Sequence, residues 1–172
     1  MAQSHRAWAI KKVEGKGRGM FANKDLNKGD LILVEKPAAY VDKWSQYLTP
    51  RDVQKATAHF TPVQRKFFYT LSDKGGSSSD RDVRIFQTNS FGEGPTKGYL
   101  CLIIARMNHS CISNAKWFRH KESETYIVTA LAKIKKGEEI TLNYLAYAQY
   151  YTAAQRNALH QEIWKCTSYS PM

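Results

Sequence analysis

The sequence has few cysteines, no CxxC pair and no long apolar run. The cysteines, Cys101, Cys111 and Cys166, number three, which fits a reducing compartment better than a disulfide framework and cannot by itself fill a four-thiolate zinc site. The longest apolar run, Tyr99 to Ala105, is far shorter than the roughly 20 residues that a membrane helix needs, and the N-terminus lacks the apolar core of a secretory signal. The sequence therefore predicts neither membrane insertion nor secretion, and no zinc site built from cysteines alone.

Acidic residues are also scarce, with 15 Asp and Glu against 26 Lys and Arg and a formal net charge of +11. Through its long-range field, such an excess speeds encounters with nucleic acid, nucleosomes, ribosomes or anionic membranes. Because the basic residues are scattered rather than massed in one tail, the alternative is a lysine-rich surface that serves solubility alone. The charge favours an acidic partner without identifying it.

The chain has 172 residues, of which 42% are hydrophobic and 24% charged, so its length and balance are those of a single globular domain over residues 1–172. We expect short strands and turns over residues 5–43 and a helical insert over residues 44–84. In the insert, Thr49 and Thr61 each precede a proline, and a threonine cap before a first-turn proline is typical of a helix start.

The second of these helices is predicted to run to about Ser72 and to end in a mobile glycine- and serine-rich loop over residues 75–79. One face of this helix is predicted to carry its apolar side chains, Val63, Phe67, Phe68 and Leu71.

The C-terminal part is predicted to return to β structure over residues 85–148. Residues 83–91 fit a helix or a strand, whereas residues 125–131 and 139–144 have the composition of strands. Over residues 149–172 we expect a last helix, which begins at Thr152 with Gln155 at the third position after it.

One pattern of strand, glycine turn and strand occurs twice. Ala22, Leu26, residues 28–30 and Ile32 recur in spacing as Ala130, Ile134, residues 136–138 and Ile140. Two copies do not make a solenoid, so the repeat predicts two similar hairpins in one β-rich domain.

Polar residues that could take part in catalysis or ligand binding follow the apolar segment that ends at Ala105. Burying Asn108, His109 and Ser110 together costs several kcal/mol unless hydrogen bonds satisfy them, so a ligand or a tight backbone crossing is expected here. The alternatives are a polar loop with all its hydrogen bonds made, a metal site at His109 and Cys111, or a cysteine hydrolase. Nothing else in the sequence supports the last two.

A glycine turn over residues 15–19 is similar to nucleotide-binding loops. It lacks the Lys-Ser/Thr of a P-loop and the full GxGxxG of a dinucleotide fold. Its glycines permit positive φ and a close backbone approach to a ligand, and the alternative is a turn that only reverses the chain.

Together these segments resemble a known family. GKGRGMFA near the N-terminus, NSF in the middle, RMNHSC after it and then KGEEITLNY make the chain similar to SET domains, nearest to the SET and MYND branch and its fungal relatives. The insert contains no cysteine, so no MYND zinc module is expected. The resemblance implies a mainly β fold of small sheets around a pseudoknot, in which a C-terminal strand crosses the segment around Asn108, with a helical insert and a C-terminal helix.

The resemblance also implies an enzyme, a protein-lysine N-methyltransferase that uses S-adenosyl-L-methionine and acts on a histone or another basic protein. It places the cofactor against Lys16, Gly17, Arg18, Asn89, Asn108, His109 and Tyr144. It makes Tyr144 the catalytic residue, whose hydroxyl orients the substrate nitrogen. The implied substrate channel is bounded by Phe91, Arg106 and Met107.

The chain departs from the family at its end. Many relatives carry a cysteine-rich post-SET segment whose thiolates share a zinc ion with the cysteine of NHSC, but here Cys166 stands alone and Ser168 occupies the next expected place. Two ligands cannot close a structural zinc site, so the post-SET zinc is expected to be absent, through loss or through a shortened chain.

The implied location is nuclear, cytoplasmic or both, and two further readings stay open. One is a SET-fold scaffold with little turnover that docks on nucleosomes or RNA, and the other is methylation of a translation factor or ribosomal protein. For an active enzyme we expect the basic surface to dock on nucleosomal DNA, RNA or an acidic protein patch. A local acidic groove would then receive the substrate lysine, near Glu122, Glu124, Glu138 or Glu139.

Overall fold

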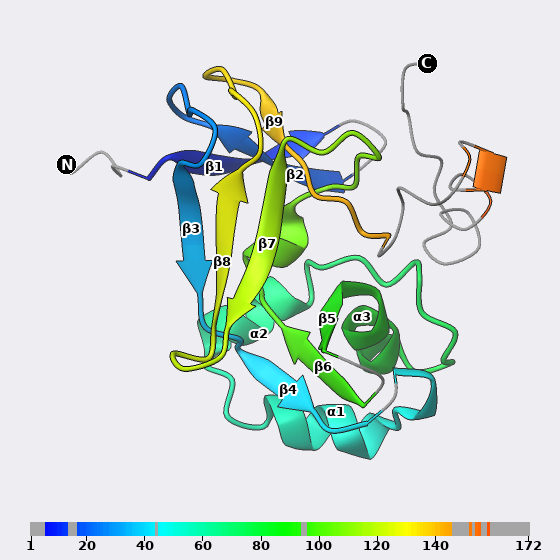
Figure 1. The fold of residues 1–172 in the computed structure, drawn as a ribbon. Helices are drawn as coiled ribbons and strands as arrows, with labels where there is room; N and C mark the ends of the chain where they lie inside the picture. The colour runs from blue at the N-terminus through cyan, green and yellow to red at the C-terminus, as the bar shows by residue number, and fades with distance from the viewer. Residues whose placement is uncertain are drawn as a thin grey trace. The chain divides into compact units, whose positions relative to one another are not determined.

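The structure, a computed structural model, describes residues 6–13, 17–43, 45–93 and 96–145, with residues 152, 154, 155 and 158. These residues form short antiparallel sheets and a few short helices, as Figure 1 shows, and the predicted mainly β fold is confirmed. The described chain divides into two compact units. The first holds the residues up to Glu35 and from Arg106 to Leu145, and the second holds Lys36 to Ala105 and the described residues from Thr152 onward. No helix among the described residues is long and apolar enough to cross a membrane.

The first unit contains two three-stranded antiparallel sheets. One has the order β1 (Trp8–Val13), β2 (Gly17–Ala22), β9 (Glu139–Ile140), and the other the order β3 (Leu31–Glu35), β8 (Thr125–Ala130), β7 (Ala115–His120). Burial alternates along the whole of β8, because successive side chains of a strand point to opposite faces. Its inward residues Tyr126 and Val128 are fully buried and join the core with Met20, Ile140 and Leu142.

The repeated sequence pattern forms two arches, residues 23–30 and residues 131–138, which pair with each other. Leu26 and Ile134 exchange both of their backbone hydrogen bonds, at 2.8 and 2.9 Å, and both side chains are buried. Further backbone hydrogen bonds join the start of each arch to the end of the other. Ala22 bonds with Gly137 and Glu138, and in the equivalent positions Ala130 bonds with Gly29 and Asp30. The two copies are therefore related by an approximate two-fold axis through the Leu26–Ile134 pair.

The prediction that the two copies are hairpins is wrong. β2 and β3 do not pair with each other, because β2 pairs with β9 and β3 pairs with β8. Each arch thus carries the chain from one sheet of the unit to the other. Gly29 and Gly137 have φ values of +91° and +89°, so the two glycines do make the turns that the sequence indicates.

The second unit is a small sheet with helices. The sheet has the order β4 (Ala39–Val41), β6 (Lys97–Leu100), β5 (Ser90–Glu93), and the helices are α1 (Pro50–Thr57), α2 (Pro62–Phe68) and α3 (Arg81–Asn89). Short 3-10 turns cover Ser45–Tyr47 and Ile104–Arg106. Apolar side chains from the helices pack with the sheet residues Ala39, Val41 and Leu100 in one core.

The helix starts at Thr49 and Thr61 are confirmed. Each threonine hydroxyl accepts the backbone N–H three residues on, and Asp52 or Gln64 accepts the backbone N–H of the threonine in return. The ambiguous residues 83–91 are both helix and strand, because α3 ends at Asn89 and β5 begins at Ser90.

The extent predicted for the second helix is wrong. α2 ends at Phe68, because Thr70 donates its backbone N–H and its hydroxyl to the Phe67 carbonyl, at 3.1 and 2.8 Å, and closes a turn there. Of its predicted apolar face, Phe68 and Leu71 are buried, whereas Val63 is 66% exposed and Phe67 37% exposed.

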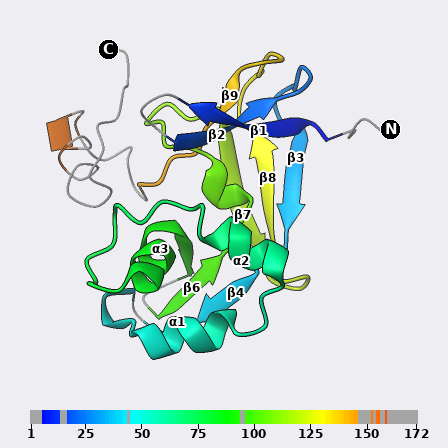
Figure 2. The ribbon, with the colours of Figure 1, turned by 180° about the vertical axis from the view of Figure 1, so that it is seen from behind.

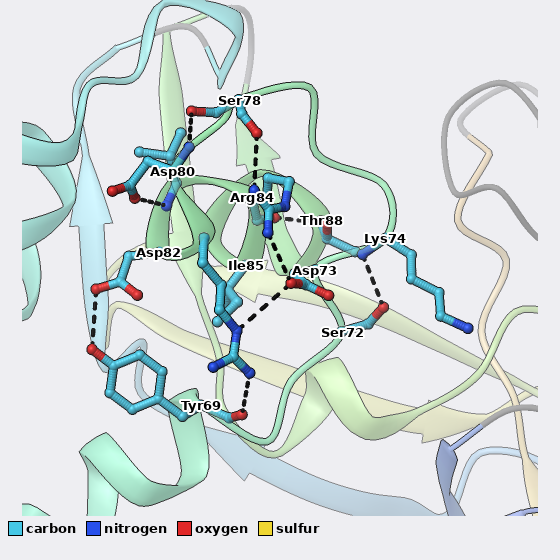
Figure 3. Close-up of polar contacts among 12 residues, drawn as sticks. Tyr69, Ser72, Asp73, Lys74, Ser78, Asp80, Asp82, Arg84, Ile85 and Thr88 are labelled. Atoms are coloured by element: carbon cyan, nitrogen blue, oxygen red, sulfur yellow. Dashed lines mark hydrogen bonds and ion pairs between the residues drawn. The ribbon is translucent and has the colours of Figure 1, made fainter.

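The glycine- and serine-rich loop that was expected to be mobile is held against α3 by Arg84 (Figure 3). The Arg84 guanidinium donates to Asp73 at 3.2 Å and to the carbonyls of Ser78 and Ser79 at 3.2 and 2.8 Å. A side chain at Gly76 would collide with the Arg84 backbone, so only glycine allows the loop to lie this close. The loop is thus a packed part of the second unit.

The last predicted helix is described only at its start. The Thr152 backbone N–H donates to Gln155 at 2.8 Å, and the Gln155 backbone N–H donates to the Thr152 hydroxyl at 3.3 Å, as the predicted cap requires. Residues 154, 155 and 158 are helical. The rest of that helix and the residues around Cys166 lie outside the described residues, and the boundaries expected at 43/44, 84/85 and 148/149 stay a prediction.

Candidate active site

The candidate site lies in the first unit, where the segment after β9 runs along the polar loop 108–115. Leu142 donates its backbone N–H to the Asn108 carbonyl at 3.0 Å and accepts from the Ser110 N–H at 2.9 Å, which makes a short parallel bridge. At the other arm of the loop, the Ala115 N–H donates to the Thr141 carbonyl at 3.2 Å. The segment is therefore bonded to both arms of the loop, and this is the tight backbone crossing expected around Asn108.

Asn114 binds the crossing segment with its side-chain amide. Its Nδ2 donates to the Glu139 carbonyl at 2.8 Å, and its Oδ1 accepts the Thr141 backbone N–H at 2.9 Å. The amide thus replaces a peptide group of a neighbouring strand. Both groups of the Asn114 amide are therefore hydrogen-bonded to backbone of the same unit, which removes most of the cost of burying that amide.

His109 fixes the backbone at Tyr144. Its Nδ1 accepts the Tyr144 backbone N–H at 3.0 Å, and its Nε2 lies 3.2 Å from Cys111 Sγ. Because Nδ1 accepts, the proton of the neutral ring must be on Nε2, which then donates to the Cys111 sulfur. The ring also contacts the Tyr144 ring, with centroids 5.4 Å apart. One imidazole therefore holds both the main chain and the ring of Tyr144.

The Tyr144 hydroxyl is held at its other end. It donates to the main-chain carbonyl of Met107, whose side chain is fully buried. A phenol oxygen that donates its proton keeps acceptor lone pairs, so this oxygen can receive a hydrogen bond from a further donor. The hydroxyl is consequently fixed in position and oriented as an acceptor.

The glycine strand β2 approaches the crossing at Gly19. A side chain there would collide with the Glu139 carboxylate and would lie 3.0 Å from Asn108 Nδ2. These two groups form a hydrogen bond, from Asn108 Nδ2 to Glu139 Oε1, at 2.6 Å. Gly17 differs, since its φ is +79° and a Cβ added there would have no atom within 4 Å. Packing against a hydrogen-bonded pair thus favours glycine at position 19, whereas backbone conformation favours glycine at position 17.

Two arginines of the first unit interact. Arg106 is only 5% exposed, and its burial, together with the positive charge of Arg18, lowers the pKa of Arg106 to about 10. Both effects oppose the charged form of Arg106. A carboxylate or phosphate beside these guanidinium groups would offset the repulsion between them.

The structure brings together most of the predicted site. Within the first unit it places Gly17, Arg18, Arg106, Met107, Asn108, His109 and Tyr144 on β2, on the loop after Ala105 and on the crossing segment. Lys16 lies outside the described residues. Asn89 and Phe91 belong to the second unit, where the Asn89 amide donates to the carbonyls of Ser72 and Ile85 at 2.6 and 2.7 Å, so their part in the site stays a prediction.

The four glutamates named for an acidic groove lie at two separate places in the first unit, and a groove near either place stays a prediction. Glu122 and Glu124 lie in the turn between β7 and β8, whereas Glu138 and Glu139 lie beyond the opposite ends of these strands, six residues away along the ladder. At about 3.3 Å per residue, that length separates the two pairs by well over 10 Å. Glu138 also accepts the Lys135 backbone N–H at 2.7 Å, so it serves its own turn.

Sequence reasoning missed three contributions. Gly19 was not singled out within the glycine turn, Glu139 was assigned to substrate rather than to Asn108, and Cys111 was considered for a metal rather than as the partner of His109. Of these three residues, only Gly19 could have been found from the sequence, through the spacing of the glycines. Among the described residues, no cluster of three or more potential ligands could hold a metal ion, and His109 and Cys111 stand as a hydrogen-bonded pair.

The fold and this site define the class of the protein. The family model of the SET domain matches residues 17–145, which is most of the chain and includes the glycine strand, the polar loop and Tyr144. The chain belongs to the SET domain family. The resemblance carried by the glycine turn, the RMNHSC segment and the EEITLNY segment is thereby confirmed.

Individual relatives agree with this assignment. Histone-lysine N-methyltransferase set5 of Schizosaccharomyces pombe is 25% identical over 154 residues, which cover 90% of this chain and 47% of that protein. The chain thus spans about half the length of this relative.

Two solved structures share the fold. The SET domain of LSMT bound to lysine and AdoHcy is 11% identical with a TM-score of 0.61, over 97% of this chain and 54% of that one. A Plasmodium falciparum protein described as a candidate histone methyltransferase is 19% identical with a TM-score of 0.50, over 86% of this chain and 99% of that one.

The contact between Gly19 and the Asn108–Glu139 pair makes a testable prediction. We expect Gly19→Ala to destabilise the protein by about 1–3 kcal/mol, because the new methyl group must displace the carboxylate. In a Glu139→Ala background the same change should cost less, by at least about 0.5 kcal/mol, since the obstacle is gone. Urea unfolding of the four proteins measures this coupling.

The control for this cycle is Gly17→Ala. It is expected to destabilise through its positive φ alone and to cost the same with or without Glu139. Equal costs of Gly19→Ala in both backgrounds would show that the packing at Gly19 is not what restricts the position to glycine.

Proposed function

We propose that the protein is an S-adenosyl-L-methionine-dependent protein-lysine N-methyltransferase in which Tyr144 is the catalytic residue. The observation that carries the proposal is the fixed Tyr144 hydroxyl, held by the Met107 carbonyl on one side and through the His109 ring and the Tyr144 backbone on the other. Together these contacts give the hydroxyl one position and leave its lone pairs available to a substrate donor. Membership of the SET domain family supports this role.

The residues present fit the proposed cofactor. Its methionyl end carries a carboxylate, and Arg18 and Arg106 offer two guanidinium groups whose mutual repulsion an anion would relieve. The absence of a side chain at Gly17 leaves open space beside that strand. We assign Lys16, Gly17, Arg18 and the Asn108–His109 pair to holding the cofactor, with Arg106 contributing its side chain and Asn89 retained from the family pattern.

When bound, S-adenosyl-L-methionine supplies a methyl group on a sulfonium ion, ready for displacement by an amine. The chain must then provide alignment, exclusion of water and a neutral lysine. A free lysine has a pKa of about 10.4 and is almost wholly protonated at neutral pH. Desolvation of the lysine in a channel closed to water lowers its pKa and favours loss of the proton.

Tyr144 is assigned to orient the lysine nitrogen. Its hydroxyl donates to Met107, so its lone pairs can accept an N–H from the substrate amine, and that bond leaves the nitrogen lone pair directed elsewhere. Main-chain carbonyls at Arg106 and Met107 and the ring of Phe91 are assigned to the walls of the lysine channel. Because the tyrosine is already fixed, alignment requires little further loss of freedom when substrate binds.

The proposed substrate is a histone lysine, and the proposed location is the nucleus. The relative from Schizosaccharomyces pombe is named for histone-lysine methylation, and a charge of +11 suits a carrier rich in phosphate such as nucleosomal DNA. A basic protein of the translation machinery, also carried on nucleic acid, is the alternative. A scaffold without turnover would not need the two-sided anchoring of Tyr144.

Replacement of the catalytic hydroxyl tests the proposed function. We expect Tyr144→Phe to abolish methyl transfer to histone peptides while cofactor affinity changes less than about threefold, because phenylalanine keeps the ring and removes only the hydroxyl that is assigned to the amine. Mass spectrometry follows transfer, and calorimetric titration follows binding. Tyr40→Phe, at a 59% exposed position of the second unit, is the control and should keep full activity. Full activity of Tyr144→Phe would refute the assignment.

The arginine pair gives a second test. We expect Arg18→Gln to weaken cofactor binding about tenfold or more, because a charge-assisted hydrogen bond to the carboxylate is lost. Lys12→Gln removes the same charge from the residue directly opposite Arg18 on β1 and should change affinity little. Calorimetric titration measures both, and equal losses would show that overall charge rather than a carboxylate contact governs binding.

A further inference from the structure

The paired arches present a group of lysines on one end of the first unit. Figures 1 and 2, which view the molecule from opposite sides, show the blue arch (residues 23–30) and the yellow arch (residues 131–138) next to each other. Their leucine and isoleucine pair is buried, and the residues around it are exposed. The exposed lysines of the two arches are Lys24, Lys28, Lys133, Lys135 and Lys136. We call these five residues the arch lysines.

The approximate two-fold axis relates lysines of one arch to lysines of the other. Lys28 and Lys136 occupy equivalent positions, each directly before a glycine with positive φ. Six backbone hydrogen bonds of 2.8 to 3.0 Å join the arches, so the backbone that carries these lysines is fixed before any partner binds. A preorganised surface loses little conformational entropy on binding apart from that of the lysine side chains themselves.

The acidic residues of the arches serve the turns. Asp25, Asp30 and Glu138 accept the backbone N–H groups of Lys136, Asn27 and Lys135, at 2.8, 2.8 and 2.7 Å. The ion pairs found among the described residues involve other basic residues and none of the arch lysines. The three carboxylates are therefore hydrogen-bonded to the backbone of the arches, and the arch lysines are exposed to solvent.

The composition of the arches narrows the choice of partner. Residues 23–30 and 131–138 contain no aromatic residue, so they offer no platform on which unpaired bases could stack. The one exposed large apolar side chain in them is Leu131, at 37%, which is too little to insert into a membrane. Lysines alone bind phosphate as point charges and read no base sequence.

We propose that the arch lysines bind the phosphate backbone of double-stranded DNA without sequence specificity. The choice of DNA rests on the proposed function, since a histone substrate is carried on duplex DNA. The surface would add affinity for that carrier and leave the chemistry at Tyr144 unchanged. It also explains how a basic enzyme can act on a basic histone segment, because the positive charge of the enzyme attracts the DNA that carries the histone and not the histone itself.

Salt dependence of DNA binding tests the proposal. The wild-type chain and the triple variant Lys28→Gln, Lys133→Gln, Lys136→Gln are titrated with a labelled DNA duplex of arbitrary sequence, from about 50 to about 200 mM salt. Each lost phosphate contact lowers the slope of log affinity against log salt by about 0.9, so the triple variant should lose about 3 in slope. Its affinity at the lower salt should fall about tenfold or more.

A matched variant separates the arches from net charge. Lys55→Gln, Lys66→Gln and Lys74→Gln remove the same charge from exposed positions of the second unit and should leave the slope nearly unchanged. An equal loss in both triple variants would overturn the proposal, because binding would then follow total charge. Tighter binding of wild type to single-stranded DNA or to duplex RNA would also overturn it.

The measurement is independent of the proposed function, because it uses neither cofactor nor substrate. Methylation of a free histone peptide by the arch variant should equal that of the wild type, whereas methylation of nucleosomes should fall. Loss of both activities in the arch variant would contradict the proposal. A wild-type chain that binds DNA through the arches and transfers no methyl group would refute the proposed function and support this inference.

Discussion

The His109 imidazole makes the hydrogen bond on which the site depends. Its Nδ1 accepts a hydrogen bond from the backbone N–H of Tyr144, and its Nε2–H donates a hydrogen bond to Cys111 Sγ. This arrangement requires a neutral ring of one tautomer, because a doubly protonated ring has no acceptor for Tyr144. With the main chain fixed, the tyrosine hydroxyl reaches the Met107 carbonyl on the same loop. The Tyr144 hydroxyl is thus held in position by residues within a single short segment.

The paired arches bring β2 and the crossing segment together around this site. Along the chain they connect β2 to β3 and β8 to β9, and they pair with each other, so the glycine strand β2 lies beside β9 and the start of the crossing segment. This places Gly19 against the Asn108–Glu139 hydrogen bond, where a larger residue would have to displace the Glu139 carboxylate. The same arches carry lysines to the surface of the unit. One symmetric element therefore supports both the interior site and the proposed contact with DNA.

Much of this could be predicted from the sequence, because local chemistry determines it. Threonine caps located α1 and α2, glycines located the arch turns, and the RMNHSC and EEITLNY segments located Asn108, His109 and Tyr144. The partners in space could not be predicted. The repeat suggested hairpins because spacing does not reveal which strand a neighbour pairs with. Likewise, nothing in the sequence around Glu139 indicates that its carboxylate binds Asn108. The end of α2 depends on a hydrogen bond of Thr70, which helix periodicity cannot show.

The central claim is that this chain transfers methyl groups to lysine, with a histone as its substrate. The most direct measurement is mass spectrometry of core histones and of whole cell extract after incubation with the protein and isotope-labelled S-adenosyl-L-methionine. The account predicts labelled methyl groups on the side-chain nitrogen of histone lysines, and none when the protein is omitted. Binding of the labelled cofactor without label on any lysine would contradict the account, and label confined to ribosomal proteins or translation factors would contradict its choice of substrate.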